Sequence, residues 1–172
     1  GIWEPTAGCS GTGVGPIMPD HVELAGRVFV EPGQESRACY HATHVAGTIG
    51  SKGVLPASEG MAPAVFITSY SLGSLFQTFR ATATSTGGAG QSRPIQISNH
   101  SYGDDPGWYW DGGYRFSSNT PFGTYNNWSW TVDNVIYQTG FVAVWAAGND
   151  RNMPQNQDLT ATSQPNDCWA IG

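Results

Sequence analysis

Residues 39–50 read CYHATHVAGTIG, with two histidines, His41 and His44, three positions apart and followed by a run of small residues. Small residues at the start of a helix let a neighbouring chain pack close to it. The stretch therefore predicts a helix that begins near His41 and faces a cleft. Three roles remain open for the histidines: metal ligands, a general base, or residues bonded to the backbone at a helix start.

A metal site is the weakest of the three roles. Cys39 lies close to both histidines, but zinc sites need three or four ligands at set spacings, and the sequence has no second ligand cluster. A general base instead needs a carboxylate to orient it, a nucleophile and donors for an oxyanion. We therefore predict no metal ligands, and the rest of the sequence must decide between the other two roles.

Composition narrows the class of protein. The 172 residues are 39% hydrophobic and 12% charged, with 23 Gly and 11 Pro, as expected for a compact, loop-rich domain. The net charge of -6 argues against nucleic acid and against anionic membranes as partners. There is no apolar run of about 18 residues and no visible signal peptide, and the start at Gly1 suggests a processed chain or a fragment.

The three cysteines, Cys9, Cys39 and Cys168, fit a secreted or extracellular protein with low Lys and many Asn, Gly, Thr and Trp. We expect one disulfide, Cys9–Cys39, which leaves one thiol over.

Short apolar runs alternate with helical patterns along the chain. Strands are predicted at 1–4, 64–71, 94–101 and 141–149, the last buried on both faces, and another could begin at 168–172. Helices are predicted at 41–51, 74–86 and 130–140. This alternation predicts an α/β fold with a mostly parallel, doubly wound sheet and helices on both faces. Residues 104–130 are rich in Gly, Asn and aromatics and are predicted to be one long loop.

Five motifs in one order resemble the subtilisin-like serine peptidases, or subtilases. They are HVELAGRV (21–28), HATHVAGTIG (41–50), GMAPAVFITSYS (60–71), ISNHSYG (97–103) and VAVWAAGNDRN (142–152). Together they span most of the chain. The resemblance implies that residues 1–172 are the N-terminal portion of one subtilisin-like catalytic domain, with 104–130 as an aromatic insertion.

The resemblance also implies roles for individual residues. His41 would be the general base, and His44 a packed structural histidine. Asn149 would donate to the oxyanion of the tetrahedral intermediate, although an Asn there could also cap a turn. Substrate-binding roles fall to two triplets: Ser101, Tyr102 and Gly103, which would pair with an extended substrate, and Ala146, Ala147 and Gly148, which would wall the specificity pocket.

The carboxylate of the triad is the member that departs most from the family's spacing. Counting back from residue 21 without a gap reaches Val14, and matching GTGV to the family's acid segment reaches Gly11. Neither is an acid. An insertion of about ten residues places Glu4 at the end of the first strand, and we predict that Glu4 orients His41. Asp20 and Glu23 are predicted to be surface residues.

The nucleophile is missing from the sequence. The family's G-T-S-M-A motif follows the oxyanion segment, and Ser163 has no such context. We expect the Ser on a C-terminal segment or a second chain, so that the fold is incomplete and these residues alone are inactive. The substrate would be a peptide or protein. The resemblance implies that calcium could be bound, since it is common in the family, but no calcium ligands can be identified in this sequence.

A second function stays open: a catalytically inactive subtilase-like module that binds peptide or glycan. Trp108, Trp110, Trp128 and Trp130 could form a stacking platform for sugars, or pack together as a lid beside the substrate cleft.

Overall fold

The computed structural model describes residues 1–4, 16–32, 39–71, 95–103, 108–110, 114–116, 124–140 and 142–147. The chain divides into two compact units, each described here by itself. The first unit comprises Gly1–Ser101 with Asp133–Trp145, and the second comprises Tyr102–Val132 with Ala146–Gly172.

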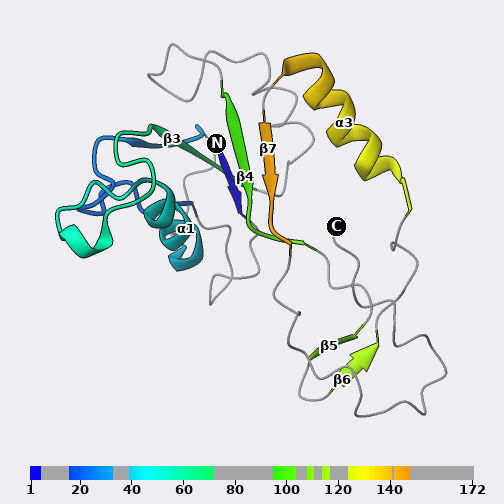
Figure 1. Ribbon diagram of the computed structural model, residues 1–172, viewed down its shortest axis with the longest axis horizontal. Coiled ribbons are helices and arrows are strands. Elements are labelled where there is room, and N and C mark those ends of the chain that lie inside the picture. The colour runs from blue at the N-terminus through cyan, green and yellow to red at the C-terminus, as the bar shows by residue number, and fades with distance from the viewer. Residues whose placement is uncertain are drawn as a thin grey trace. The chain divides into compact units, whose positions relative to one another are not determined.

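A five-stranded parallel sheet organises the first unit (Figure 1). Its strands, in sequence order, are β1 (Ile2–Glu4), β2 (Val28–Val30), β3 (Ile67–Ser71), β4 (Ile97–His100) and β7 (Val142–Trp145). In space the order is β2-β3-β1-β4-β7. The strand that comes first in the sequence therefore lies at the centre of the sheet, paired with β3 on one side and β4 on the other.

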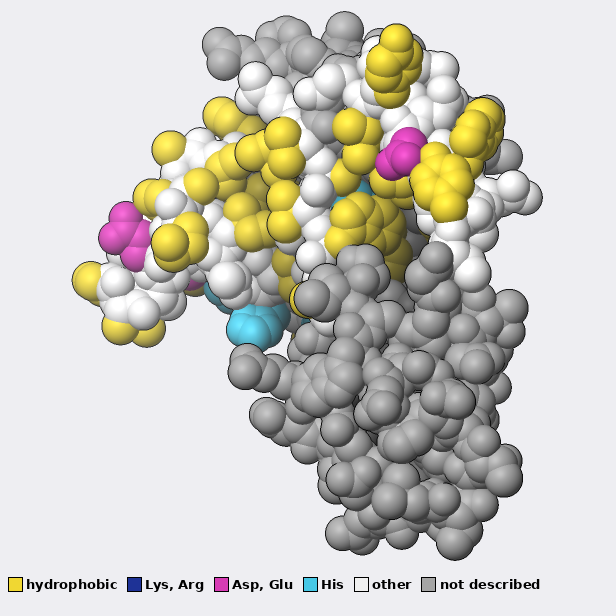
Figure 2. Space-filling model, turned by 45° about the vertical axis from the view of Figure 1, so that its right-hand side comes forward, with side chains coloured by type: hydrophobic (Ala, Val, Ile, Leu, Met, Phe, Trp, Pro, Cys, Tyr) yellow, Lys and Arg dark blue, Asp and Glu magenta, His cyan; other side chains and the backbone are white. Residues whose placement is uncertain are grey.

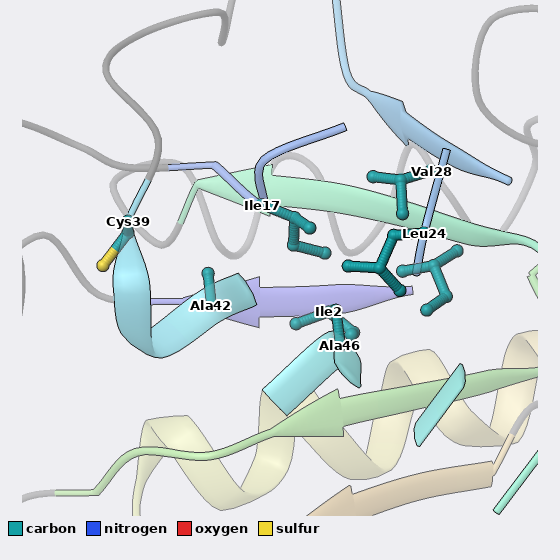
Figure 3. Packing of buried hydrophobic residues seen from close by; sticks show 8 residues of the cluster. Ile2, Ile17, Leu24, Val28, Cys39, Ala42 and Ala46 are labelled. Carbon is teal, nitrogen blue, oxygen red and sulfur yellow. The ribbon is translucent and has the colours of Figure 1, made fainter. Parts of the chain in front are cut away.

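Helix α1 (Tyr40–Gly50) packs on the central strand β1. Its buried face is made of small residues, which allow a close approach. Ala42 and Ala46 are one helical turn apart and fully buried, so the helix can lie close to β1. Figure 3 shows Ala46 beside Ile2 of β1, and Ala42 belongs to the same buried cluster. The core is completed by Ile17, Leu24, Val28, Cys39 and Ile67.

The chain after α1 turns back on the helix through a short 3-10 helix, η2 (Pro56–Ser58), and a glycine. A Cβ on Gly60 would lie 2.6 Å from the amide nitrogen of Ser51 and 2.8 Å from the carbonyl oxygen of Gly47. Backbone cannot move aside as a side chain can. Glycine is therefore required at residue 60 for the loop to reach the end of α1.

Helix α3 (Asn127–Thr139) has a clear beginning and end. The Asn126 side chain accepts hydrogen bonds from the backbone amides of Trp128 (2.8 Å) and Ser129 (3.2 Å), as helix-capping residues do. Gly140 has a φ of +71° and ends the helix, as the sequence predicts.

The segment 104–130 differs from the predicted loop. Strands β5 (Trp108–Trp110) and β6 (Tyr114–Phe116) form an antiparallel pair, and α3 already begins at Asn127. Aromatic residues favour strands, and the sequence Asp-Gly-Gly at 111–113 between the two aromatic runs is a hairpin turn signal.

Other predicted elements also have clear outcomes. The strands at β1, β3 and β4, the helix α1 and the parallel sheet are confirmed, whereas helices covering both faces are not established by the described residues. The predictions at 74–86 and 168–172 lie outside those residues. Strand β2 was missed, although Val-Phe-Val directly after the turn at Gly26 signals it.

The prediction that the last strand is buried on both faces is wrong. Val142 of β7 is 59% exposed and Val144 is 48% exposed; both lie on the same face of the strand, so that face of β7 is not covered. Figure 2 shows that hydrophobic side chains predominate over acidic ones on the face of the described residues that it presents. None of the described helices is long and apolar enough to cross a membrane.

Candidate functional site

His41 is the second residue of α1 and is half-buried. Figure 3 shows that the beginning of this helix, marked by Cys39, lies at the arrowhead end of β1. Functional groups in open parallel sheets gather at this end, beyond the carboxyl termini of the strands. The prediction that His41 lies near a helix N-terminus is confirmed.

Several bonds anchor this helix start. Cys39 is buried and disulfide-bonded, and its amide donates to the carbonyl oxygen of Pro16 at 2.8 Å. The amide of Met18 donates to Thr43 Oγ1 at 3.0 Å, and that hydroxyl donates to the Cys39 carbonyl at 2.8 Å. The amide of Ile17 donates to Ser69 Oγ of β3 at 3.2 Å. Residues 16–18 therefore tie the start of α1 to the sheet.

Both remaining cysteines lie outside the described residues, so the predicted pairing of Cys39 with Cys9 stays a prediction.

Glu4 ends the central strand. Its backbone is paired with Ser71 at the carboxyl end of β3, and α1 contacts β1. The side chain of Glu4 is not among those the structure describes. A hydrogen bond from His41 to Glu4 therefore stays a prediction, while the position of the residue at the strand end agrees with it.

Glu23 is a buried structural carboxylate, and its prediction as a surface residue is wrong. Its carboxylate accepts hydrogen bonds from the amides of Val54 (2.9 Å) and Leu55 (2.8 Å) and from Ser58 Oγ (3.2 Å). These bonds, led by the one from Leu55, hold the pKa of Glu23 below its usual value. The group fastens the loop after α1, and its oxygens are committed to that loop rather than to His41. Asp20 is exposed, as predicted.

His44 is exposed, so its prediction as a packed histidine is wrong. It lies two positions after Ala42 and two before Ala46, and therefore on the side of the helix opposite these buried alanines. No group of three or more metal-ligating side chains occurs in the part of the chain that the structure describes.

The residues predicted to bind substrate follow β4 and β7. Ser101 comes directly after β4, where its hydroxyl accepts a hydrogen bond from Asn99 Nδ2 at 2.8 Å. Tyr102 is half-buried and Gly103 exposed, and a Cβ on Gly103 would meet nothing within 4 Å. Exposed Ala146 and Ala147 directly follow β7. Gly148 and Asn149 lie outside the described residues.

No role was predicted for His100 from the sequence, yet its side chain is fully buried, at 0% exposure. Its Nε2 lies 2.9 Å from Ser98 Oγ, and its ring stacks on the indole of Trp145 at a centroid distance of 4.0 Å. Burial lowers the pKa of His100 to about 4. Trp145 itself is 37% exposed and covers one face of the His100 ring. A histidine within an otherwise strand-like run was the only signal available in the sequence.

Comparison with known proteins agrees with the motifs. The sequence model of the Subtilase family matches residues 20–171, which leaves Glu4 outside the matched region. No curated protein and no solved structure matches the chain. The family match covers most of the sequence, including the motifs around His41, Ser101 and Ala146. The chain therefore belongs to the subtilase family, and its activity is of the serine peptidase type.

Proposed function

We propose that this chain supplies the base, the orienting acid and the substrate-binding strand ends of a serine endopeptidase. One observation carries the proposal: helix α1, whose second residue is His41, starts at the carboxyl end of the central strand, where Glu4 lies. That is the end of a parallel sheet where reacting groups can meet.

In the proposed mechanism His41 takes the proton from the nucleophilic Ser and later gives it to the leaving amine. Glu4 accepts a hydrogen bond from the other ring nitrogen, which fixes the tautomer of His41 and stabilises the imidazolium. The side-chain amide of Asn149 donates to the oxyanion, an interaction worth about 3 kcal/mol in the transition state of such enzymes. The Ser lies on a segment outside this sequence or on a second chain.

Substrate binding uses the strand ends. Ser101 to Gly103 would pair through the backbone with an extended peptide, as in strand addition. Ala146 and Ala147, with Gly148 after them, would form a pocket wall whose small side chains leave room for a sizeable substrate residue.

Labelling by a fluorophosphonate probe tests the proposal in the full polypeptide that contains this chain. We expect labelling that His41→Ala abolishes and that the exposed control His44→Ala leaves within about twofold. Equal labelling of the wild type and His41→Ala would exclude His41 as the base.

The acid is tested separately. Glu4→Gln should keep the shape but favour the wrong tautomer, and peptidase activity should fall by orders of magnitude, up to about 10⁴-fold. The matched change Asp20→Asn, at an exposed carboxylate, should be neutral. If Asp20→Asn is the damaging change and Glu4→Gln is not, the insertion has been placed wrongly.

We also propose that the protein works in an oxidising compartment, as a secreted or extracellular enzyme. The disulfide at Cys39 supports this, because such bonds persist mainly outside the cytosol. Thiol titration of the purified protein, without reductant, should find Cys39 blocked.

A non-catalytic binding module remains the second candidate, favoured by exposed indoles on α3. Trp128 and Trp130 are 44% and 53% exposed in the second unit. Binding of peptide or glycan by a protein that the fluorophosphonate does not label, lost on Trp128→Ala, would favour this candidate over the peptidase.

A further inference from the structure

Three residues in register form one row near the carboxyl ends of β1, β4 and β7. Trp3 of β1 pairs with His100 of β4, and His100 pairs with Trp145 of β7. Each of the three immediately precedes a residue to which we assign a function: Glu4, Ser101 and Ala146 respectively. The central member of the row is His100, whose strand is paired on both sides.

His100 is locked in place by its side chain as well as by its strand. Neighbouring strands are about 4.8 Å apart, so two flat rings at paired positions can stack face to face. The rings of His100 and Trp145 do so, at 4.0 Å between centroids and 10° between planes. Ser98, two residues earlier on the same face of β4 and also fully buried, holds His100 Nε2 at 2.9 Å.

We propose that His100 is a positioning residue that locks the carboxyl end of β4 to that of β7 and so fixes where the two substrate-binding segments start. The inference rests on the proposed function, because it concerns the assigned segments that begin at Ser101 and Ala146.

The observed contacts explain why the ring must be an uncharged aromatic. Trp145 covers one face of His100, and the burial that lowers its pKa to about 4 keeps the imidazole neutral at physiological pH. A neutral ring can both stack on the indole and bond to a hydroxyl without the cost of burying a charge. Without the ring, Trp145 loses its stacking partner on β4.

Two substitutions separate the ring from its polar atom. His100→Phe keeps a stacking ring and removes the bond to Ser98, whereas His100→Gln keeps a polar group and removes the ring. In the full polypeptide we would compare a tetrapeptide anilide with a large side chain before the scissile bond against p-nitrophenyl acetate, which uses neither segment. His44→Gln is the matched control at an exposed histidine, and far-UV circular dichroism verifies the fold of each variant.

We expect His100→Gln to raise KM for the anilide so that kcat/KM falls at least tenfold, because misplacements of about 1 Å cost that much or more. Acetate hydrolysis should stay within about threefold, and His100→Phe and His44→Gln should remain near wild type on both substrates.

The outcomes separate this inference from the proposed function. An active wild type whose His100→Gln variant hydrolyses the anilide within twofold of normal overturns the role of His100 alone. An equal loss of activity on both substrates also overturns it. So does a His100→Phe variant that is folded but no longer hydrolyses the anilide, in the case where His100→Gln does not fold. A folded wild type that hydrolyses neither substrate overturns the proposed function and this inference together.

Discussion

Acidification should unfold this protein partly through His100. The ring is fully buried against Trp145, and burial lowers its pKa from the usual 6.5 to about 4. In the unfolded chain the same histidine takes up a proton near pH 6.5. The unfolded state therefore binds more protons between these two values, and the free energy of unfolding falls as the pH is lowered through that window.

The magnitude follows from the width of the window. Each pH unit between 6.5 and about 4 removes about 1.4 kcal/mol of stability, up to about 3 kcal/mol in total. Partial exposure of the covering Trp145 gives some screening, so we expect about 2–3 kcal/mol. The full stability is therefore present above pH 6.5, and the loss of stability levels off below about pH 4.

The assay compares wild type with His100→Phe, which cannot take up a proton but keeps the ring. Urea denaturation followed by circular dichroism at pH 7.5, 6.5, 5.5 and 4.5 gives the unfolding free energy of both proteins. Acidic groups and the other histidines titrate in both, so they cancel in the difference. The wild type should lose stability relative to His100→Phe as the pH falls below 6.5. Parallel curves from pH 7.5 to 4.5, or an NMR titration of the His100 ring with a pKa near 6.5, would refute the reasoning.

Three further changes test the packing around the site. Gly60→Ala should destabilise by about 1–3 kcal/mol or more, because its Cβ would meet backbone of α1, whereas Gly47→Ala meets only a side-chain oxygen at 3.4 Å and should be neutral or stabilising in thermal melts. Glu23→Gln should lower the urea midpoint at pH 7 more than Glu59→Gln at an exposed site, and the difference should shrink as the pH falls below 4.5, since the depressed pKa of Glu23 contributes stability only above that range. Thr43→Val removes two hydrogen bonds at the start of α1 and should cost about 1–2 kcal/mol in the same denaturation assay, and an unchanged midpoint would show that those bonds are dispensable.

The sequence was most informative where local pattern and packing agree. Small residues after His41 predicted a closely packed helix, and Ala42 and Ala46 are indeed its buried face. Gly140 predicted a helix end that its positive φ confirms. The parallel sheet followed from the alternation of strands and helical patterns.

Misses came where tertiary contacts decide. Nothing local distinguishes a solvated glutamate from Glu23, whose partners Val54 and Leu55 lie some thirty positions away in the sequence. The role proposed for His100 depends on its stacking with Trp145. The register between β4 and β7, and not proximity in the sequence, brings these two residues together. The apolar run of β7 predicts a buried strand by composition alone, yet the exposure of its side chains depends on what packs against each face of the sheet.

The central place of β1 has a consequence for how the protein is made. During synthesis β1 leaves the ribosome before any strand that it pairs with, and Ile2 must find both Ser69 and Asn99. At about 5–20 residues per second, the second partner follows several seconds later. Until then β1 can pair only with β3, and pairings this distant in sequence form slowly. The edge of β1 that pairs with β4 therefore stays open until β4 has been made, and only then can the sheet close around β1.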